Sequence, residues 1–156
     1  MAEAKHAIDV RVPVRTAYNQ WTQFESFPQF MEGVKEVRQL DDKHLHWVAE
    51  VGGKTQEWDA AITEQLPDQR VAWKSTTGDP NSGVVTFHYL EPDKTRVMLQ
   101  LDYAPQGVVE GAGAALGFLD RRMKGDMERF KRFIESQGQA TGAWRGTIED
   151  HPELGH

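Results

Sequence analysis

Six runs of residues with an alternating apolar pattern follow one another between Val34 and Ala104. Short turn sequences separate them, and the clearest is Gly52-Gly53, because both positions of a two-residue hairpin need positive φ. Strands joined in this way are antiparallel neighbours. Alternation gives the resulting sheet one apolar face, and that face needs a cover. No other feature of the sequence restricts the possible folds as strongly.

The cover is a long helix, which we predict over residues 108–137. Its apolar residues, from Val109 to Ile134, recur at steps of three and four and therefore share one face. Three glycines between residues 111 and 117 weaken its first half, since each costs about 1 kcal/mol relative to alanine in a helix interior. They indicate either close packing on the sheet or a space beneath the helix. The second half, Met123 to Ile134, is expected to be plain core.

The remaining elements are a strand over His6 to Val12 and two short helices after it. We therefore predict an α+β fold in which a curved seven-stranded antiparallel sheet grips one long C-terminal helix. Residues 1–138 form this domain. Residues 139–156 lack periodicity and are expected to be a flexible tail, in which Trp144 and Ile148 are the side chains able to dock.

Composition excludes several classes of function. The 156-residue chain has no cysteine, so we expect no disulfide, no thiol catalyst and no cysteine-ligated metal. It has no run of 18 apolar residues and no secretory signal pattern, so we expect a cytoplasmic protein without a membrane-spanning segment. The net charge of −6, with basic residues scattered among acidic ones, argues against nucleic acid as a partner.

The stretch from Val12 to Val37, VPVRTAYNQWTQFESFPQFMEGVKEV, carries a recognisable pattern: a strand, then Pro, Tyr and Trp at fixed spacing, then Phe-Pro-x-Phe-Met. The residues concerned are Pro13, Tyr18, Trp21, Phe27, Pro28, Phe30 and Met31. This pattern resembles the N-terminal signature of the polyketide cyclase/dehydrase and Coq10-like branch of the START-like, or SRPBCC, superfamily. Over residues 4–137 the chain looks like the helix-grip fold of that superfamily. The resemblance implies a deep apolar cavity between the sheet and the long helix.

The residues expected to face that cavity come from the second short helix, from the inward phase of the strands and from the long helix. They are Phe30, Trp47, Trp58, Ala60, Trp73, Phe87, Tyr89, Leu99, Leu101, Tyr103, Ala112, Leu116, Leu119 and Met123. Large aromatic residues on the sheet and small ones at the start of the helix are typical of an apolar site with a few polar tips. We therefore predict that the protein binds a small lipophilic ligand, such as a lipid, an isoprenoid or a polyketide-like compound, and uses no cofactor.

Two other functions remain open. The first is polyketide aromatase/cyclase or dehydratase activity, with Tyr89 or Tyr103 as proton donor. The aromatase/cyclases that the chain resembles carry Trp-x-Trp-x-Ser-x-Arg on one strand, but here Ala60 and Ile62 occupy the Ser and Arg positions, which counts against this reaction. The second is a protein-interaction role of the Coq10 or ribosome-associated kind, through the tail or the outer face of the sheet.

Histidines prompt a metal hypothesis, which the pattern does not support. His44 and His46 lie two apart on a predicted strand and share its outer face. Glu57 or Asp59 can approach His46 across the hairpin, but the pattern lacks a third ligand for a metal ion. We expect solvated outer-face residues and no metal site.

Overall fold

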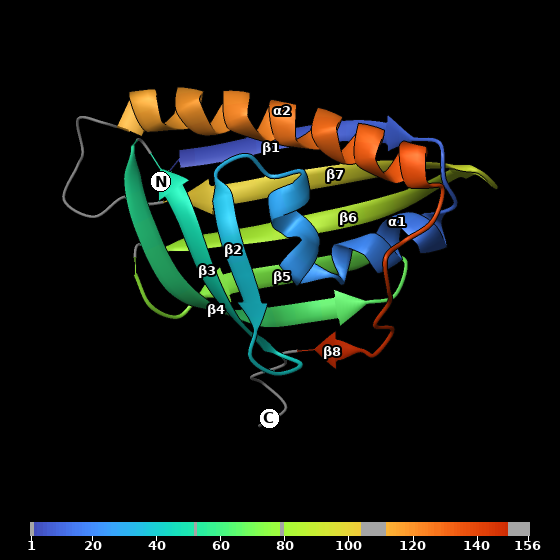
Figure 1. Cartoon of the computed structure of the whole chain (residues 1–156), viewed down its shortest axis with the longest axis horizontal. Coiled ribbons are helices and arrows are strands. Elements are labelled where there is room, and N and C mark those ends of the chain that lie inside the picture. The colour runs from blue at the N-terminus through green and yellow to red at the C-terminus, as the bar shows by residue number, and fades with distance from the viewer. Residues whose placement is uncertain (1, 52, 79, 104–111, 150–156) are drawn as a thin grey trace.

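The computed structural model describes residues 2–51, 53–78, 80–103 and 112–149, and it describes side chains for these residues except 2, 51, 103 and 112–119. Seven strands form one antiparallel sheet in the order β1-β7-β6-β5-β4-β3-β2 (Figure 1). They are β1 (Ala2–Val10), β2 (Val34–Gln39), β3 (His44–Val51), β4 (Lys54–Leu66), β5 (Arg70–Ser75), β6 (Asn81–Glu91) and β7 (Lys94–Tyr103). The predicted meander is confirmed, because β2 to β7 each pair with their neighbours in the chain and β1 pairs with β7.

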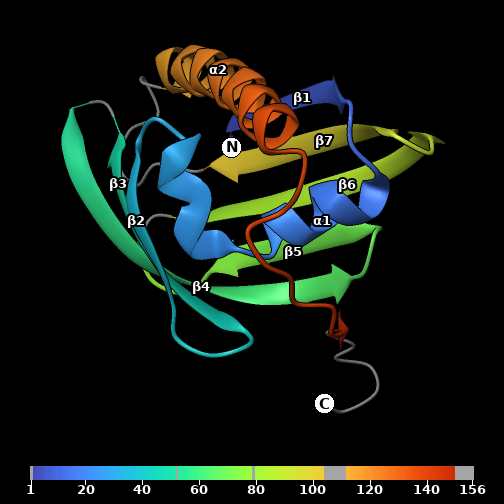
Figure 2. The ribbon, with the colours of Figure 1, turned by 45° about the vertical axis from the view of Figure 1, so that its right-hand side comes forward.

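The sheet curves into half a barrel around the helices, as Figure 2 shows. The long strand β4 bends, and its pairing with β5 shifts register between Ile62 and Glu64. A second shift lies between Val34 and Glu36, where β2 meets β3. Such bulges increase the local twist and let a sheet close around its own concave face. The predicted curved sheet is therefore confirmed.

The helix α2 (Ala112–Gln137) lies across the concave face and runs beside β1 (Figures 1 and 2). Met123, Met127, Phe130 and Ile134 are all buried, so its second half is core, as predicted. Gly138 has a φ of 70°, and its N–H donates to the Ile134 carbonyl at 2.9 Å, which ends the helix. None of the helices in the described ranges combines the length and apolar character needed to cross a membrane.

Two short helices, α1 (Val14–Trp21) and η1 (Phe24–Gln29), lie between β1 and β2 in the sequence. Pro13 stands before α1, and its carbonyl accepts the N–H of Ala17 at 3.1 Å. Trp21 packs against Phe30 and Phe130 with ring centroids 5.8 and 5.2 Å away, respectively. These aromatic residues occupy the concave face under the second half of α2. Space remains on this face beside Arg122 and Asp126, near the middle of α2.

The C-terminal segment corrects the prediction of a flexible tail as far as residue 149. Ile148 is only 4% exposed, and β8 (Ile148–Glu149) pairs antiparallel with β4. Arg145 donates to Asn19 Oδ1 at 2.7 Å and pairs with Asp68 at 2.8 Å. These contacts are long-range, so a pattern search along the chain could not find them. Residues 150–156 lie outside the described residues.

Candidate functional site

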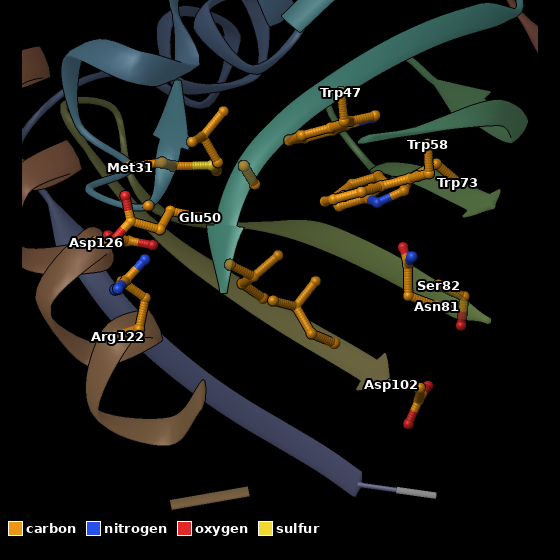
Figure 3. Close-up of a pocket in the computed structure, with 15 residues that line it drawn as sticks. Met31, Trp47, Glu50, Trp58, Trp73, Asn81, Ser82, Asp102, Arg122 and Asp126 are labelled. Atoms are coloured by element: carbon orange, nitrogen blue, oxygen red, sulfur yellow. The ribbon is translucent and has the colours of Figure 1, made fainter. Parts of the chain in front are cut away.

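A cavity of about 140 Å³ lies between the sheet and α2. Figure 3 shows its lining, which comes from β2 to β7, from the connection between η1 and β2, and from α2. The lining residues are Met31, Gly33, Val34, Trp47, Ala49, Glu50, Trp58, Trp73, Asn81, Ser82, Leu99, Leu101, Asp102, Arg122 and Asp126. Apolar side chains form the walls, and the polar residues gather at two ends.

Three tryptophans from adjacent strands form one wall. Trp47 on β3 and Trp58 on β4 are directly opposite in the register, and their rings are 5.9 Å apart at an angle of 4°. Trp73 on β5 continues the stack, 6.3 Å from Trp47 at 25°. Side chains of paired residues project from the same face of a sheet, so alternation on each strand aligns the three rings. The result is a nearly parallel set of flat aromatic surfaces (Figure 3).

Gly83 on β6 makes room for this wall. It stands opposite Trp73 in the β5–β6 register, and a Cβ at this position would lie 2.4 Å from Trp73 Cζ2. Since real Cβ atoms do not approach so closely, any larger residue would displace the indole ring. Leu101 on β7 is also close, because its Cδ2 would lie 2.9 Å from a Cβ on Gly83. The side chains of Trp73 and Leu101 thus occupy the space that a side chain at position 83 would need.

Charged residues of α2 and β3 mark one end of the cavity. Figure 3 shows Arg122 directed towards Asp126 and Glu50. Asp126 has a side chain only 14% exposed, and it accepts a hydrogen bond from Arg129 and another from the Glu32 N–H at 3.0 Å. Burial raises the pKa of Asp126, while these donors and the charge of Arg122 oppose the rise.

Arg122 lies against the connection between η1 and β2. A Cβ on Gly33 would fall 1.5 Å from Arg122 Nη1, so the guanidinium occupies the space that a side chain would take. Among the described residues of the lining, Arg122 carries the one positive charge. The absence of a side chain at position 33 therefore lets this charge reach the cavity.

Asn81, Ser82 and Asp102 lie at the other end (Figure 3). Ser82 and Asp102 are paired residues of β6 and β7. The Asn81 N–H donates to Ser75 Oγ at 3.0 Å, which joins the beginning of β6 to the end of β5. These polar residues border a turn whose residue 79 lies outside the described residues.

The structure brings together only some of the predicted site residues. Trp47, Trp58, Trp73, Leu99 and Leu101 line the cavity, as the inward phase of their strands indicated. Other predicted residues are buried in the core and are not part of the lining, namely Phe30, Ala60, Phe87 and Met123. The side chains of four more lie outside the described ones, namely Tyr103, Ala112, Leu116 and Leu119.

Tyr89 is a correction. It has the expected strand phase but is 63% exposed. It lies near the end of the β6–β7 hairpin, which projects beyond α1 and α2 in Figure 1, and the pairing shifts register between Tyr89 and Glu91. Alternation along a strand predicts which face of the sheet a side chain lies on. The helices that cover this face do not extend as far as Tyr89.

Several lining residues were not predicted. Ala49 could have been found, since it follows Trp47 by two residues and shares its face. Arg122 and Asp126 are four residues apart on α2, which places them on adjacent turns. Asp126 also precedes the buried Met127, and this charged residue within the apolar helix face was the available signal.

The predicted approach to His46 is confirmed on the outer face of the sheet. Its ring nitrogens lie 2.7 Å from Asp59 Oδ1 and 3.1 Å from Glu57 Oε1, and its side chain is 19% exposed. Hydrogen bonds to Asp59 and Glu57 raise the pKa of His46, because they favour the protonated ring. Within the described part of the chain no three histidine or acidic residues are arranged to hold a metal ion.

Comparison with known sequences places this geometry in a family. Residues 10–132 match the family described as polyketide cyclase / dehydrase and lipid transport. The chain belongs to this family. A protein of Streptomyces lincolnensis, described as an uncharacterized 17.2 kDa protein in the melC2-rnhH intergenic region, is 56% identical over 149 residues, which cover 95% of this chain and 99% of that protein.

Solved structures of the family's fold are similar to this one. DR_A0006 from Deinococcus radiodurans is 28% identical, with a TM-score of 0.69 over 88% of this chain and 99% of that chain. The Zhui aromatase/cyclase from a Streptomyces species is 16% identical, with a TM-score of 0.74 over 91% of this chain and 98% of that chain. A START superfamily protein from Mycobacterium smegmatis is also 16% identical, with a TM-score of 0.70 over 88% and 97%. These likenesses establish the helix-grip fold.

Proposed function

We propose that this family member binds a small apolar molecule in the cavity between the sheet and α2. The observation that carries the proposal is the wall of Trp47, Trp58 and Trp73 around a space of about 140 Å³. Apolar surface that leaves water on binding contributes about 25 cal/mol per Å², before the cost of ordering the ligand. The polar residues at the two ends can orient a ligand that carries oxygen atoms.

The size of the space supports binding over simple core packing. Protein interiors are packed so closely that they hold few voids larger than a water molecule. The space here, about 140 Å³, is larger than one water molecule needs and is partly open to the outside. A chain under selection for stability alone would fill it, whereas a ligand-binding protein needs it open.

The aromatase/cyclase alternative has less support. Ala60 and Ile62, which stand at the Ser and Arg positions of the cyclase pattern, are buried and offer no polar side-chain atom. Tyr89 is exposed near the end of a hairpin and does not line the cavity. A proton donor at this position would be remote from a ligand held against the tryptophans.

The test is native mass spectrometry of the protein as purified, before and after extraction with organic solvent. We expect a population with added mass that the solvent removes, and the extracted compound to be apolar. The delipidated protein should then take up an apolar compound with a change in tryptophan fluorescence. Absence of any bound compound, together with no uptake of apolar compounds, would refute the proposal.

A further inference from the structure

We infer that the C-terminal segment, residues 139–149, closes over one internal water molecule that is bound by Tyr18, Gln65 and Asp68. This site lies between α1 and the end of β4, and its three residues are not part of the lining of the cavity under α2. The inference does not depend on the proposed function. Three features carry it: the unpartnered polar atoms of these residues, their positions around Arg145, and the contacts that hold the segment in place.

Tyr18, Gln65 and Asp68 each have one buried polar atom without a hydrogen-bond partner in the part of the chain that the structure describes. These atoms are Tyr18 Oη, Gln65 Nε2 and Asp68 Oδ1. Tyr18 and Gln65 are 0% and 1% exposed, so bulk water does not reach them. A buried polar group without a partner costs free energy, and proteins commonly satisfy such groups with an internal water that makes about three hydrogen bonds. One water molecule can therefore serve all three atoms.

Arg145 lies between Asp68 and Tyr18. Its guanidinium pairs with Asp68 Oδ2 at 2.8 Å, and its Cζ is 5.4 Å from the centre of the Tyr18 ring. Burial raises the pKa of Tyr18, while the nearby amide of Gln65 and the charge of Arg145 oppose the rise and the charge of Asp68 adds to it. The amide, the carboxylate and the guanidinium therefore all act on the Tyr18 hydroxyl.

The donors and acceptors of the site favour a neutral molecule that can both donate and accept. Gln65 Nε2 is a donor, Asp68 Oδ1 is an acceptor, and the Tyr18 hydroxyl can be either. The carboxylate of Asp68 disfavours an anion, and the guanidinium of Arg145 disfavours a cation. A water molecule can accept a hydrogen bond from Gln65, donate one to Asp68 and still bond to Tyr18. Water therefore fits the site better than an ion does.

The C-terminal segment is fastened on both sides of Arg145. Before Arg145, the Thr141 N–H donates to Gln20 Oε1 at 2.9 Å. After it, Ile148 is 4% exposed and is paired with Gln65 across β8 and β4. Figures 1 and 2 show the segment running from the end of α2 past α1 to β8. We therefore expect the water to exchange with solvent only when the segment opens.

Oxygen-17 magnetic relaxation dispersion of the full chain tests the site, because it detects water molecules that stay bound for longer than the protein takes to tumble. We expect the signal of one such water to be lost in Gln65→Met, which keeps the length of the side chain but removes its amide. Tyr18→Phe should lower Tm by about 2–4 °C, since it removes one hydrogen bond to the water. Tyr89→Phe is the matched control and should leave Tm unchanged, because Tyr89 is 63% exposed.

Two results would overturn the inference of a bound water. One is a higher Tm in Tyr18→Phe, because removal of a hydroxyl that has no partner relieves a penalty. The other is an unchanged dispersion in Gln65→Met. Ile148→Ala tests the cover, since it loosens the segment without a change in the three polar residues. It should shorten the residence time of the water at least about tenfold. An unchanged residence time would show that the segment does not close the site.

Discussion

Two alanines on neighbouring strands allow a direct test that the cavity is open. Ala49 on β3 lines the cavity, whereas Ala60 on β4 is 0% exposed and does not. Leucine adds three carbons at either position. At Ala49 these carbons enter empty space, and at about 0.8 kcal/mol per buried carbon the gain is at most about 2 kcal/mol. At Ala60 the same carbons enter a filled core, which costs about 1–3 kcal/mol.

The two variants should therefore shift stability in opposite directions. For a chain of 156 residues, about 2 kcal/mol corresponds to a change in Tm of about 4–8 °C. In circular dichroism melting, the Tm of Ala49→Leu should be higher than that of the unsubstituted protein, and the Tm of Ala60→Leu should be lower. The same Ala49→Leu protein, once delipidated, should bind apolar compounds more weakly than the unsubstituted protein, because the leucine occupies the site. If Ala49→Leu lowers Tm as Ala60→Leu does, the space is already filled and the reasoning from cavity volume fails.

Three further predictions concern other parts of the molecule. Gly83→Ala should push Trp73 into the cavity and lower the affinity of the delipidated protein for apolar compounds, with a loss of about 1–3 kcal/mol in unfolding free energy; unchanged affinity would contradict the close contact. Because the pKa of His46 is raised in the folded protein, its contribution to stability is complete below the ordinary value of 6.5 and is lost as pH rises through the raised one. His46→Asn should therefore lower urea stability by up to about 1 kcal/mol at acidic pH and by less at pH of about 8.5, with His88→Asn as an exposed control; a loss that does not change with pH would count against this origin. Ile148→Ala should lower the free energy of unfolding in urea by about 2 kcal/mol, since Ile148 is buried beside β4. An unchanged free energy of unfolding would instead support a flexible tail.

Much of the fold could be predicted because its signals are local. The alternation from residue 34 onward and the turns between the strands specify an antiparallel meander without knowledge of any distant contact. The apolar stripe of α2 likewise predicted which of its residues are buried, as Met127 and Phe130 illustrate. The tryptophan wall could be predicted from the same alternation, since Trp47 and Trp58 are at inward-facing positions of two strands that pair with each other.

The position and limits of the cavity depended on contacts between distant segments. Phase alone placed Tyr89 inside, but the helices end before they reach it. Phe30, which was predicted to belong to the site, instead packs on Phe130. Arg122 enters the lining because Gly33, far away in the chain, leaves room for its guanidinium.

Local patterns in the chain thus specify the strands, the helix and the face that each of them buries, because periodicity records the direction of each side chain. They do not record how far a covering helix extends, which partner fills the space below it, or that Ile148 returns to pair beside β4. Those outcomes follow from the packing of segments that meet only in the folded protein. For this reason the apolar wall could be read from the chain, while its open volume and its charged end belong to the tertiary structure.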